Sequence, residues 1–184
     1  IHLKSARELE VMRRAGEATA RILHEMAAAV QPGMITRDLD TLAEKRCKEL
    51  GVKPAFKGYH GYPCSVCISV NDQVVHGIPS DRELKMGDIV GIDFGVIVDG
   101  YYGDSAITVG VGTISTEAQK LLDITCESLQ KGIQEAMKML MGKRYKVIYD
   151  RNICIGAAAC ATAAPEGWEI DKEDGKANLI GGQK

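Results

Sequence analysis

The feature that most constrains this chain is a pair of apolar segments separated by Asp99-Gly100. Residues 89–98 and 101–111 are rich in β-branched and aromatic side chains, which favours extended strands. Asp-Gly is a strong signal for a two-residue hairpin turn, because both residues tolerate positive φ. The sequence therefore predicts a long antiparallel hairpin, and the rest of the fold must be arranged around its sheet.

Helical patterns lie on both sides of this hairpin. Residues 5–30 repeat apolar side chains at helical spacing, and Ser5 followed by Glu8 has the pattern of a capping box. Thr36 is expected to cap a second helix and Ser115 a third. Helices, a sheet of hairpins and then another helix predict an α+β fold in which helices flank an antiparallel sheet.

The composition excludes several classes of protein. Hydrophobic residues make up 45% and charged residues 26% of the 184 residues, as in ordinary globular domains. A net charge of −2 without a basic stripe argues against a nucleic-acid partner. The apolar runs are too short to span a bilayer, and residues 1–5 lack the layout of a secretion signal. We therefore expect a cytoplasmic protein with neither nucleic-acid nor membrane partners, whose six cysteines are free thiols.

Two aspartates interrupt the apolar strands of the hairpin. If the strands pair around the turn, Asp93 and Asp104 are expected to lie directly opposite each other, with Cβ atoms about 5 Å apart. Two like charges at that distance repel unless a cation or a proton lies between them. A divalent metal bridging both carboxylates is one interpretation. The alternative is that one carboxylate faces solvent beyond the edge of the sheet.

His76 is a second candidate for chemistry. The segment His76-Gly-Ile-Pro79 places an imidazole on a constrained loop, which follows a short extended stretch from Val74. There the imidazole can face a pocket and hydrogen-bond to a substrate, or it can simply be solvated. Cys64 and Cys67 have the spacing of half a zinc or redox site, but no second pair stands at the distance that a zinc site requires.

Several short motifs occur in one order along the chain. They are Gly58-Tyr-His-Gly-Tyr-Pro63, Ser65-Val-Cys-Ile-Ser-Val-Asn71, Val75-His-Gly-Ile-Pro79, Gly87-Asp-Ile-Val90, Ile92-Asp93 and Asp99-Gly-Tyr-Tyr-Gly-Asp104. In this order they resemble the type I methionine aminopeptidases, which are metallopeptidases of the pita-bread fold. The resemblance covers residues 1–136 and implies half of that fold.

The resemblance implies a role for seven residues. Asp93 and Asp104 match two metal ligands, the first bidentate and the second bridging, and His76 matches a histidine that assists catalysis near the substrate amide. The implied activity is removal of N-terminal methionine from nascent proteins, with water activated at a centre of two Co, Mn, Fe or Zn ions. The pocket for the methionine side chain corresponds to Phe56, Tyr59, Tyr62 and Cys67, where some relatives carry cysteine in place of Phe56.

The same resemblance shows what this chain lacks. The family takes a further metal-binding histidine, two glutamates and a substrate-binding histidine from its second half, whereas no histidine follows His76 here. Two aspartates alone hold a divalent ion weakly, because water fills the remaining positions. We expect an incomplete metal site with little or no activity on N-terminal Met peptides or nascent chains. Half of a fold also exposes an apolar face, which either self-association or the C-terminal segment must cover.

After a junction at residues 137–144, residues 145–184 resemble the first half of a ferredoxin. Cys154 and Cys160 hold the first and third positions of the cluster loop, but Ala157 and Ala164 occupy the second and fourth. A cubane cluster normally needs four thiolates, so we expect no iron–sulfur cluster.

Two alternative functions remain open from the sequence. The first is a degenerate iron–sulfur electron-transfer protein, based on Cys154 and Cys160. The second is a non-catalytic chimera, in which a foreign strand-rich piece completes half of a pita-bread fold. For that piece the sequence predicts a strand at residues 146–149. It also predicts a hairpin, with residues 168–170 and 177–180 joined by a turn at Asp174-Gly175.

Overall fold

The computed structural model describes residues 4–140, 168–170 and 177–179. One compact unit spans Lys4–Lys131 and contains the main sheet. Helix α1 (Ala6–Ala29) and helix α2 (Thr36–Leu50) precede strands β1 (Lys53–Pro54) and β2 (Val66–Val70), with a short 3-10 turn, η1 (Tyr59–Gly61), between the two strands. Strands β3 (Ile89–Val98) and β4 (Tyr101–Gly110) form the hairpin, and helix α3 (Thr116–Leu140) follows. The predicted α+β arrangement with an antiparallel sheet is confirmed.

The predicted capping box at the start of α1 is confirmed. The Ser5 backbone N–H donates to Glu8 Oε2 at 2.7 Å, and the Glu8 N–H donates to Ser5 Oγ at 3.3 Å. The hydroxyl of Tyr101 also donates to Glu8 Oε1 at 2.8 Å. Glu8 therefore satisfies an orphan donor of the helix and ties its first turn to β4.

These contacts predict how the stability of the capping box depends on pH. Hydrogen bonds from the Ser5 backbone and side chain, followed by that from Tyr101, lower the pKa of Glu8 to about 2. A depressed folded-state pKa gives stability that is present above the ordinary value of 4.5 and is lost as the pH falls towards 2. We expect Ser5→Ala to cost about 1 kcal/mol. Glu8→Gln should destabilise the protein at pH 7 but have little effect near pH 2, as measured by urea unfolding at both values. An equal effect at both pH values would contradict this assignment.

The start of α2 differs from the prediction by one residue. Ile35 is the N-cap, with its backbone N–H bonded to Asp38 Oδ2 at 3.4 Å, and Thr36 is the first helical residue. The Thr36 hydroxyl instead donates to the Ser80 carbonyl at 3.0 Å and accepts from the Ser80 N–H at 2.8 Å. The Thr36 hydroxyl therefore bonds to a residue 44 positions away instead of capping the helix, as the local pattern had predicted.

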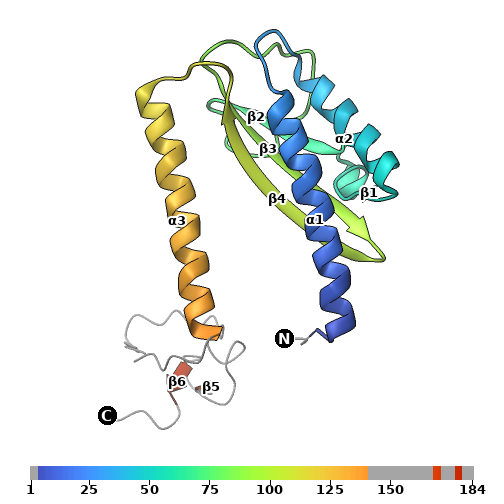
Figure 1. Cartoon of the computed structure of the whole chain (residues 1–184), viewed down its shortest axis with the longest axis vertical. Coiled ribbons are helices and arrows are strands. Elements are labelled where there is room, and N and C mark those ends of the chain that lie inside the picture. Colours follow the sequence, from blue (N-terminus) through green and yellow to red (C-terminus); the bar gives the residue numbers. More distant parts are fainter. Residues whose placement is uncertain (1–3, 141–167, 171–176, 180–184) are drawn as a thin grey trace. The chain divides into compact units, whose positions relative to one another are not determined.

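Strand β3 is the centre of the main sheet. It pairs antiparallel with β2 and β1 on one side and with β4 on the other, so β4 is an edge strand among the described strands. Helices α1 and α2 lie side by side over one face of this sheet (Figure 1). The other face carries the side chains that concern function.

The core lies between the helices and the inner face of the sheet. Alternate residues of β3 are fully buried there, since successive side chains of a strand point to opposite faces. Fully buried members of the core include Val90, Ile92, Phe94 and Val96 of β3, Ile22 and Met26 of α1, and Leu39 of α2. The positions of β3 between them, Gly91, Asp93 and Gly95, therefore face away from the helices.

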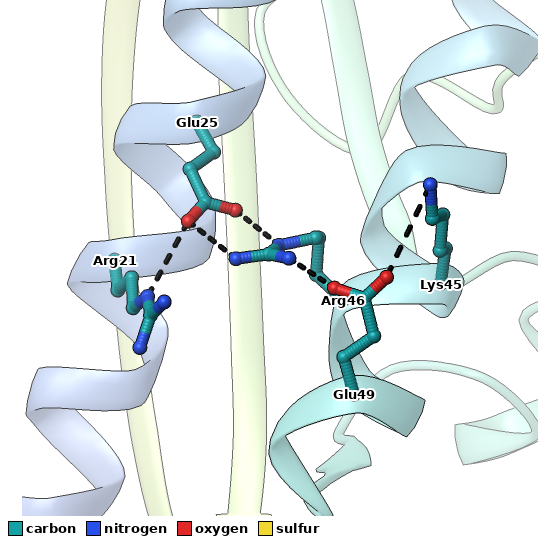
Figure 2. Close-up of polar contacts among 5 residues, drawn as sticks. All are labelled: Arg21, Glu25, Lys45, Arg46 and Glu49. Atoms are coloured by element: carbon teal, nitrogen blue, oxygen red, sulfur yellow. Dashed lines mark hydrogen bonds and ion pairs between the residues drawn. The ribbon is translucent and has the colours of Figure 1, made fainter.

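A network of charges links α1 to α2 (Figure 2). The guanidinium of Arg46 bonds both carboxylate oxygens of Glu25, with Nη2 to Oε1 at 2.7 Å, and also contacts Glu49. The Arg46 hydrogen bond is the main reason that the pKa of Glu25 is lowered. Arg21 approaches Glu25 from the same helix at 3.4 Å, and Lys45 approaches Glu49 at 4.0 Å. A bidentate pair of this kind fixes the relative position of the two helices.

The register of the hairpin corrects the prediction for the two aspartates. The Asp99-Gly100 turn pairs Val98 with Tyr101, which places Asp93 opposite Ala106. Asp104 lies opposite Gly95. The two acids are therefore diagonal neighbours, whose Cβ atoms typically lie up to about 7–8 Å apart. An offset of two residues keeps side chains on the same face, so the expected juxtaposition survives with a wider spacing.

Helix α3 begins as predicted. The Ala118 N–H donates to the Ser115 hydroxyl at 3.1 Å. The helix continues to Leu140, past the start of the predicted junction at residue 137. Five of its large apolar side chains are exposed, and they recur at helical spacing: Leu121, Ile124, Leu129, Ile133 and Met137.

The described part of the C-terminal segment is a small hairpin. Strand β5 (Trp168–Ile170) pairs antiparallel with β6 (Ala177–Leu179), which confirms the predicted pairing. Cys154, Cys160 and the predicted strand at residues 146–149 lie outside the described residues. Within the described part of the chain, no helix combines the length and apolar character needed to cross a membrane.

Candidate functional site

A cavity of about 570 Å³ opens on the face of the sheet opposite the helices. It is bounded by the segment around η1, by the loop that carries His76, and by strands β2, β3 and β4. All seven residues selected from the sequence line it. The complete lining is Phe56, Tyr59, His60, Gly61, Tyr62, Pro63, Cys67, His76, Ile78, Asp93 and Asp104.

The two aspartates form the polar end of this cavity. Burial is the main cause that raises the pKa of Asp93, and the neighbouring charge and hydrogen-bonding contact of Asp104 raise it further. The charge of His76 acts in the opposite direction. Two carboxyl groups held this close disfavour double ionisation, and a cation between them would relieve the repulsion. The pair therefore suits a divalent ion chemically.

The ligand set at this end of the cavity is incomplete. Within residues 4–140, 168–170 and 177–179, no group of three or more His, Cys, Asp or Glu side chains is arranged to hold a metal ion. Divalent cations that prefer oxygen usually take six or more ligands, with waters filling what the protein does not supply. Asp93 and Asp104 thus fit as part of a metal site and would need further ligands to form a tight one.

Aromatic rings form one wall of the cavity. The Phe56 ring lies close to Gly95 of β3. A Cβ at Gly95 would lie only 3.1 Å from Phe56 Cε1, so the absence of a side chain there makes room for the ring. Tyr59 is 68% exposed and meets the His60 ring edge to face, with ring centroids 4.4 Å apart. Because Tyr59 is so exposed, the mouth of the cavity presents an aromatic surface to solvent.

Cys67 contributes an uncharged wall to the cavity. It is buried and free, and it lies opposite Asp93 in the β2–β3 register. Burial raises the pKa of its thiol, a hydrogen bond from Tyr62 partly opposes this effect, and the charges of Asp93 and Asp104 raise the pKa further. Cys64 is also a free thiol, with its pKa raised by burial and by Asp40. Neutral thiols are poor metal ligands, so Cys67 acts here as a small apolar group.

His76 lies on a loop, as predicted. Residues 74–79 belong to none of the described strands, although the Gly77 carbonyl accepts a hydrogen bond from the Ile68 N–H of β2. His76 itself has a φ of 57°, in the left-handed region that few residues other than glycine adopt. His60, Gly61, Pro63 and Ile78 also line the cavity, although their residue types alone predict no role there. Their only signal was their place within the same motifs.

Two family models match this chain. The first, described as metallopeptidase family M24, matches residues 10–164. The second, described as a 4Fe-4S single cluster domain, matches residues 147–184. The second match agrees with the resemblance of the C-terminal segment to a ferredoxin, and it covers the part that lies mostly outside the described residues.

Curated relatives of high identity are methionine aminopeptidases. Methionine aminopeptidase 1 of Bacillus subtilis is 50% identical over 133 residues, which is 72% of this chain and 54% of that protein. The methionine aminopeptidase of Aquifex aeolicus is 49% identical over 144 residues, 74% of this chain and 56% of that protein. The chain therefore spans about half the length of the curated relatives it matches.

Solved structures agree with these matches. Methionine aminopeptidase from Thermotoga maritima superposes with a TM-score of 0.71 at 36% identity, over 94% of this chain and 66% of that one. Escherichia coli aminopeptidase P gives a TM-score of 0.60 at 28% identity, over 69% of this chain and 28% of that one. The sheet and flanking helices described above are thus part of the fold that these aminopeptidases share.

Proposed function

Because the chain belongs to metallopeptidase family M24, we propose that residues 1–136 form the N-terminal lobe of a methionine-aminopeptidase-type enzyme. The observation that carries the proposal is the single cavity that gathers Asp93, Asp104 and His76 beside an aromatic wall. One end offers carboxylates and an imidazole, and the other offers apolar surface. This division suits a substrate with a reactive peptide bond next to an apolar side chain.

Each part of the cavity has a chemical task in this proposal. Asp93 and Asp104 would hold divalent metal, which supplies a Lewis acid and lowers the pKa of bound water when present. The imidazole of His76 would hydrogen-bond to the substrate amide beside the bond that breaks. The methionine side chain would lie against Phe56, Tyr59, Tyr62 and Cys67, where sulfur and aromatic rings make favourable contacts. These apolar groups also exclude water from one side of the substrate.

We propose that this lobe does not complete the reaction alone. Asp93 and Asp104 are the acids of the described chain that line the cavity, and no histidine follows His76 in the sequence. The match covers 54% of the Bacillus subtilis relative, and we propose that the unmatched part of such a protein supplies the missing ligands. Oxygen ligands favour Mn or Fe over a thiolate-type zinc site, and Co, Mn, Fe and Zn are all candidates, held weakly.

A methionine-release assay tests the proposal. With a Met-Gly-Met peptide and Mn²⁺, Fe²⁺, Co²⁺ or Zn²⁺, we expect no release above that of the metal ion without protein. Addition of the separately produced second half of the Bacillus subtilis relative should restore release, because it supplies the absent ligands. Asp93→Asn should abolish the restored activity. Sustained release by the chain alone, lost in Asp93→Asn, would refute the claim that the site is incomplete.

The proposed substrate class suggests the setting in which the protein acts. Nascent chains with an N-terminal methionine are made in the cytoplasm, and we propose this as the compartment. The exposed apolar row of α3, from Leu121 to Met137, would bury its surface by association with a second copy. The solution mass of the purified chain, measured by light scattering, distinguishes a monomer from such a dimer.

The match to a 4Fe-4S single cluster domain supports a ferredoxin-like origin for residues 145–184. We propose that this segment, beyond a junction at 137–144, is an appendage with two free thiols at Cys154 and Cys160. Two thiolates fall short of the four that a cubane cluster normally takes. Iron and sulfide analysis of the reconstituted chain separates this proposal from that of an electron-transfer protein with a degenerate cluster.

A further inference from the structure

The backbone at His76 requires an explanation of what holds it. Its φ of 57° is strained for a residue with a side chain, and such conformations persist only when the surrounding structure fixes them. The loop around it has little packing of its own, since Val74, Val75 and Ile78 are exposed. The restraint must therefore come from polar contacts of the loop backbone.

Those contacts converge on the next residue, Gly77. Its carbonyl accepts a hydrogen bond from the Ile68 N–H at 2.8 Å and another from the Tyr62 hydroxyl at 3.1 Å. Its own N–H donates to the Ser69 hydroxyl oxygen at 3.1 Å. Both backbone polar groups of Gly77 are thus bonded to β2 or to a side chain beside it.

The approach of Gly77 to β2 is unusually close. A Cβ atom at Gly77 would lie 2.0 Å from the carbonyl oxygen of Ile68, so only glycine fits at this point. The Tyr62 hydroxyl also lies 3.1 Å from the Val66 carbonyl and hydrogen-bonds to Cys67, so its single proton is shared among these acceptors. Burial raises the pKa of Tyr62, which keeps the phenol protonated and able to donate.

We propose that Ser69 and Tyr62 are positioning residues that set the imidazole of His76 in the cavity by clamping Gly77 to β2. Ser69 lies two residues after Cys67, so its side chain is on the same face of the sheet as the cavity. Tyr62 lines the cavity and also bonds the loop, so the wall that would contact the substrate is mechanically joined to His76. The proposal rests on the proposed function for the use of His76, whereas the clamp itself is a property of the metal-free chain.

Amide hydrogen exchange of the metal-free chain tests the clamp directly. Ser69→Ala should speed exchange at the Gly77 amide by about two- to tenfold, the effect of losing one hydrogen bond. Ser69→Thr, which keeps the hydroxyl, should restore the slow rate. Ser105→Ala removes a hydroxyl from the exposed part of β4 and should leave Gly77 unchanged. Equal Gly77 exchange in Ser69→Ala and the parent, or failure of Ser69→Thr to rescue, would overturn the proposal.

A second measurement shows whether the clamp positions His76. Mn²⁺ bound between the aspartates should broaden the NMR signals of the His76 ring and of the Asp93 and Asp104 amides. In Ser69→Ala and Tyr62→Phe we expect less broadening at His76 and unchanged broadening at the aspartates. Unchanged broadening at all three residues would overturn the positioning role. If Mn²⁺ broadens none of them in the parent chain, the metal proposal fails, and the exchange result still decides the clamp.

Discussion

Asp93→Asn is expected to weaken Mn²⁺ binding by about ten- to a hundredfold, because a charge-assisted ligand contact contributes about 1.5–3 kcal/mol. Asp93 is the more enclosed acid of the pair, while Asp104 is exposed on the edge strand. Without the Asp93 charge there is no repulsion between the two carboxylates, and a cation then gains less by binding between them. Isothermal titration with Mn²⁺, or the electron paramagnetic signal of free Mn²⁺, gives both dissociation constants.

The same substitution should stabilise the metal-free chain near neutral pH. Burial and the charge of Asp104 raise the pKa of Asp93. A raised folded-state pKa means that stability is lost as the pH rises through that value. Asp72→Asn, in an exposed turn, changes the net charge equally and should alter neither Mn²⁺ binding nor stability. Identical Mn²⁺ affinities for Asp93→Asn and Asp72→Asn would show that Asp93 is not a ligand.

Gly103→Ala is expected to destabilise the lobe by about 1–3 kcal/mol, the usual cost of overpacking a closed interface. A Cβ at Gly103 of β4 would lie 2.4 Å from the carbonyl oxygen of Ala15 and 2.6 Å from the hydroxyl oxygen of Thr19. Both belong to α1, and a backbone carbonyl cannot swing aside as a long side chain can. The helix must therefore move away from the hairpin, which urea or thermal unfolding would detect.

Gly16→Ala provides the matched control for this substitution. Gly16 lies in the same helix, and a Cβ there would have no atom within 4 Å. Alanine is preferred to glycine inside a helix by about 0.5–1 kcal/mol. We therefore expect Gly16→Ala to raise stability while Gly103→Ala lowers it. Similar effects of both substitutions would contradict the close approach of α1 to β4.

Local patterns predicted most of the elements, whereas most of the residues that line the cavity were implied by the resemblance to a known family. The Ser5 and Ser115 caps and the turn at Asp99-Gly100 depend on neighbours a few residues away, and all three occur as expected. Asp93 and Asp104 were predicted to lie directly opposite each other, but Asp93 lies opposite Ala106 and Asp104 lies opposite Gly95. A two-residue turn already implies that Val98 pairs with Tyr101, and counting back along both strands gives the observed diagonal.

Contacts between distant segments could not be predicted in the same way. Thr36 has the pattern of a cap, but Ser80 takes its hydroxyl because the loop before β3 returns to that point. The clamp between Ser69 and Gly77 likewise depends on how closely a loop approaches β2. No periodicity or spacing encodes such an approach. Gly77 can be read from the sequence, but the close approach to the Ile68 carbonyl that requires a glycine there cannot.

The position of β4 at the edge of the sheet has a consequence for the isolated lobe. Among the described strands it pairs only with β3, so its outer side offers a row of backbone donors and acceptors to any extended chain. Asp104 lies on this strand. A foreign strand paired there would place some of its own side chains next to Asp104, on the face of the sheet that carries the cavity.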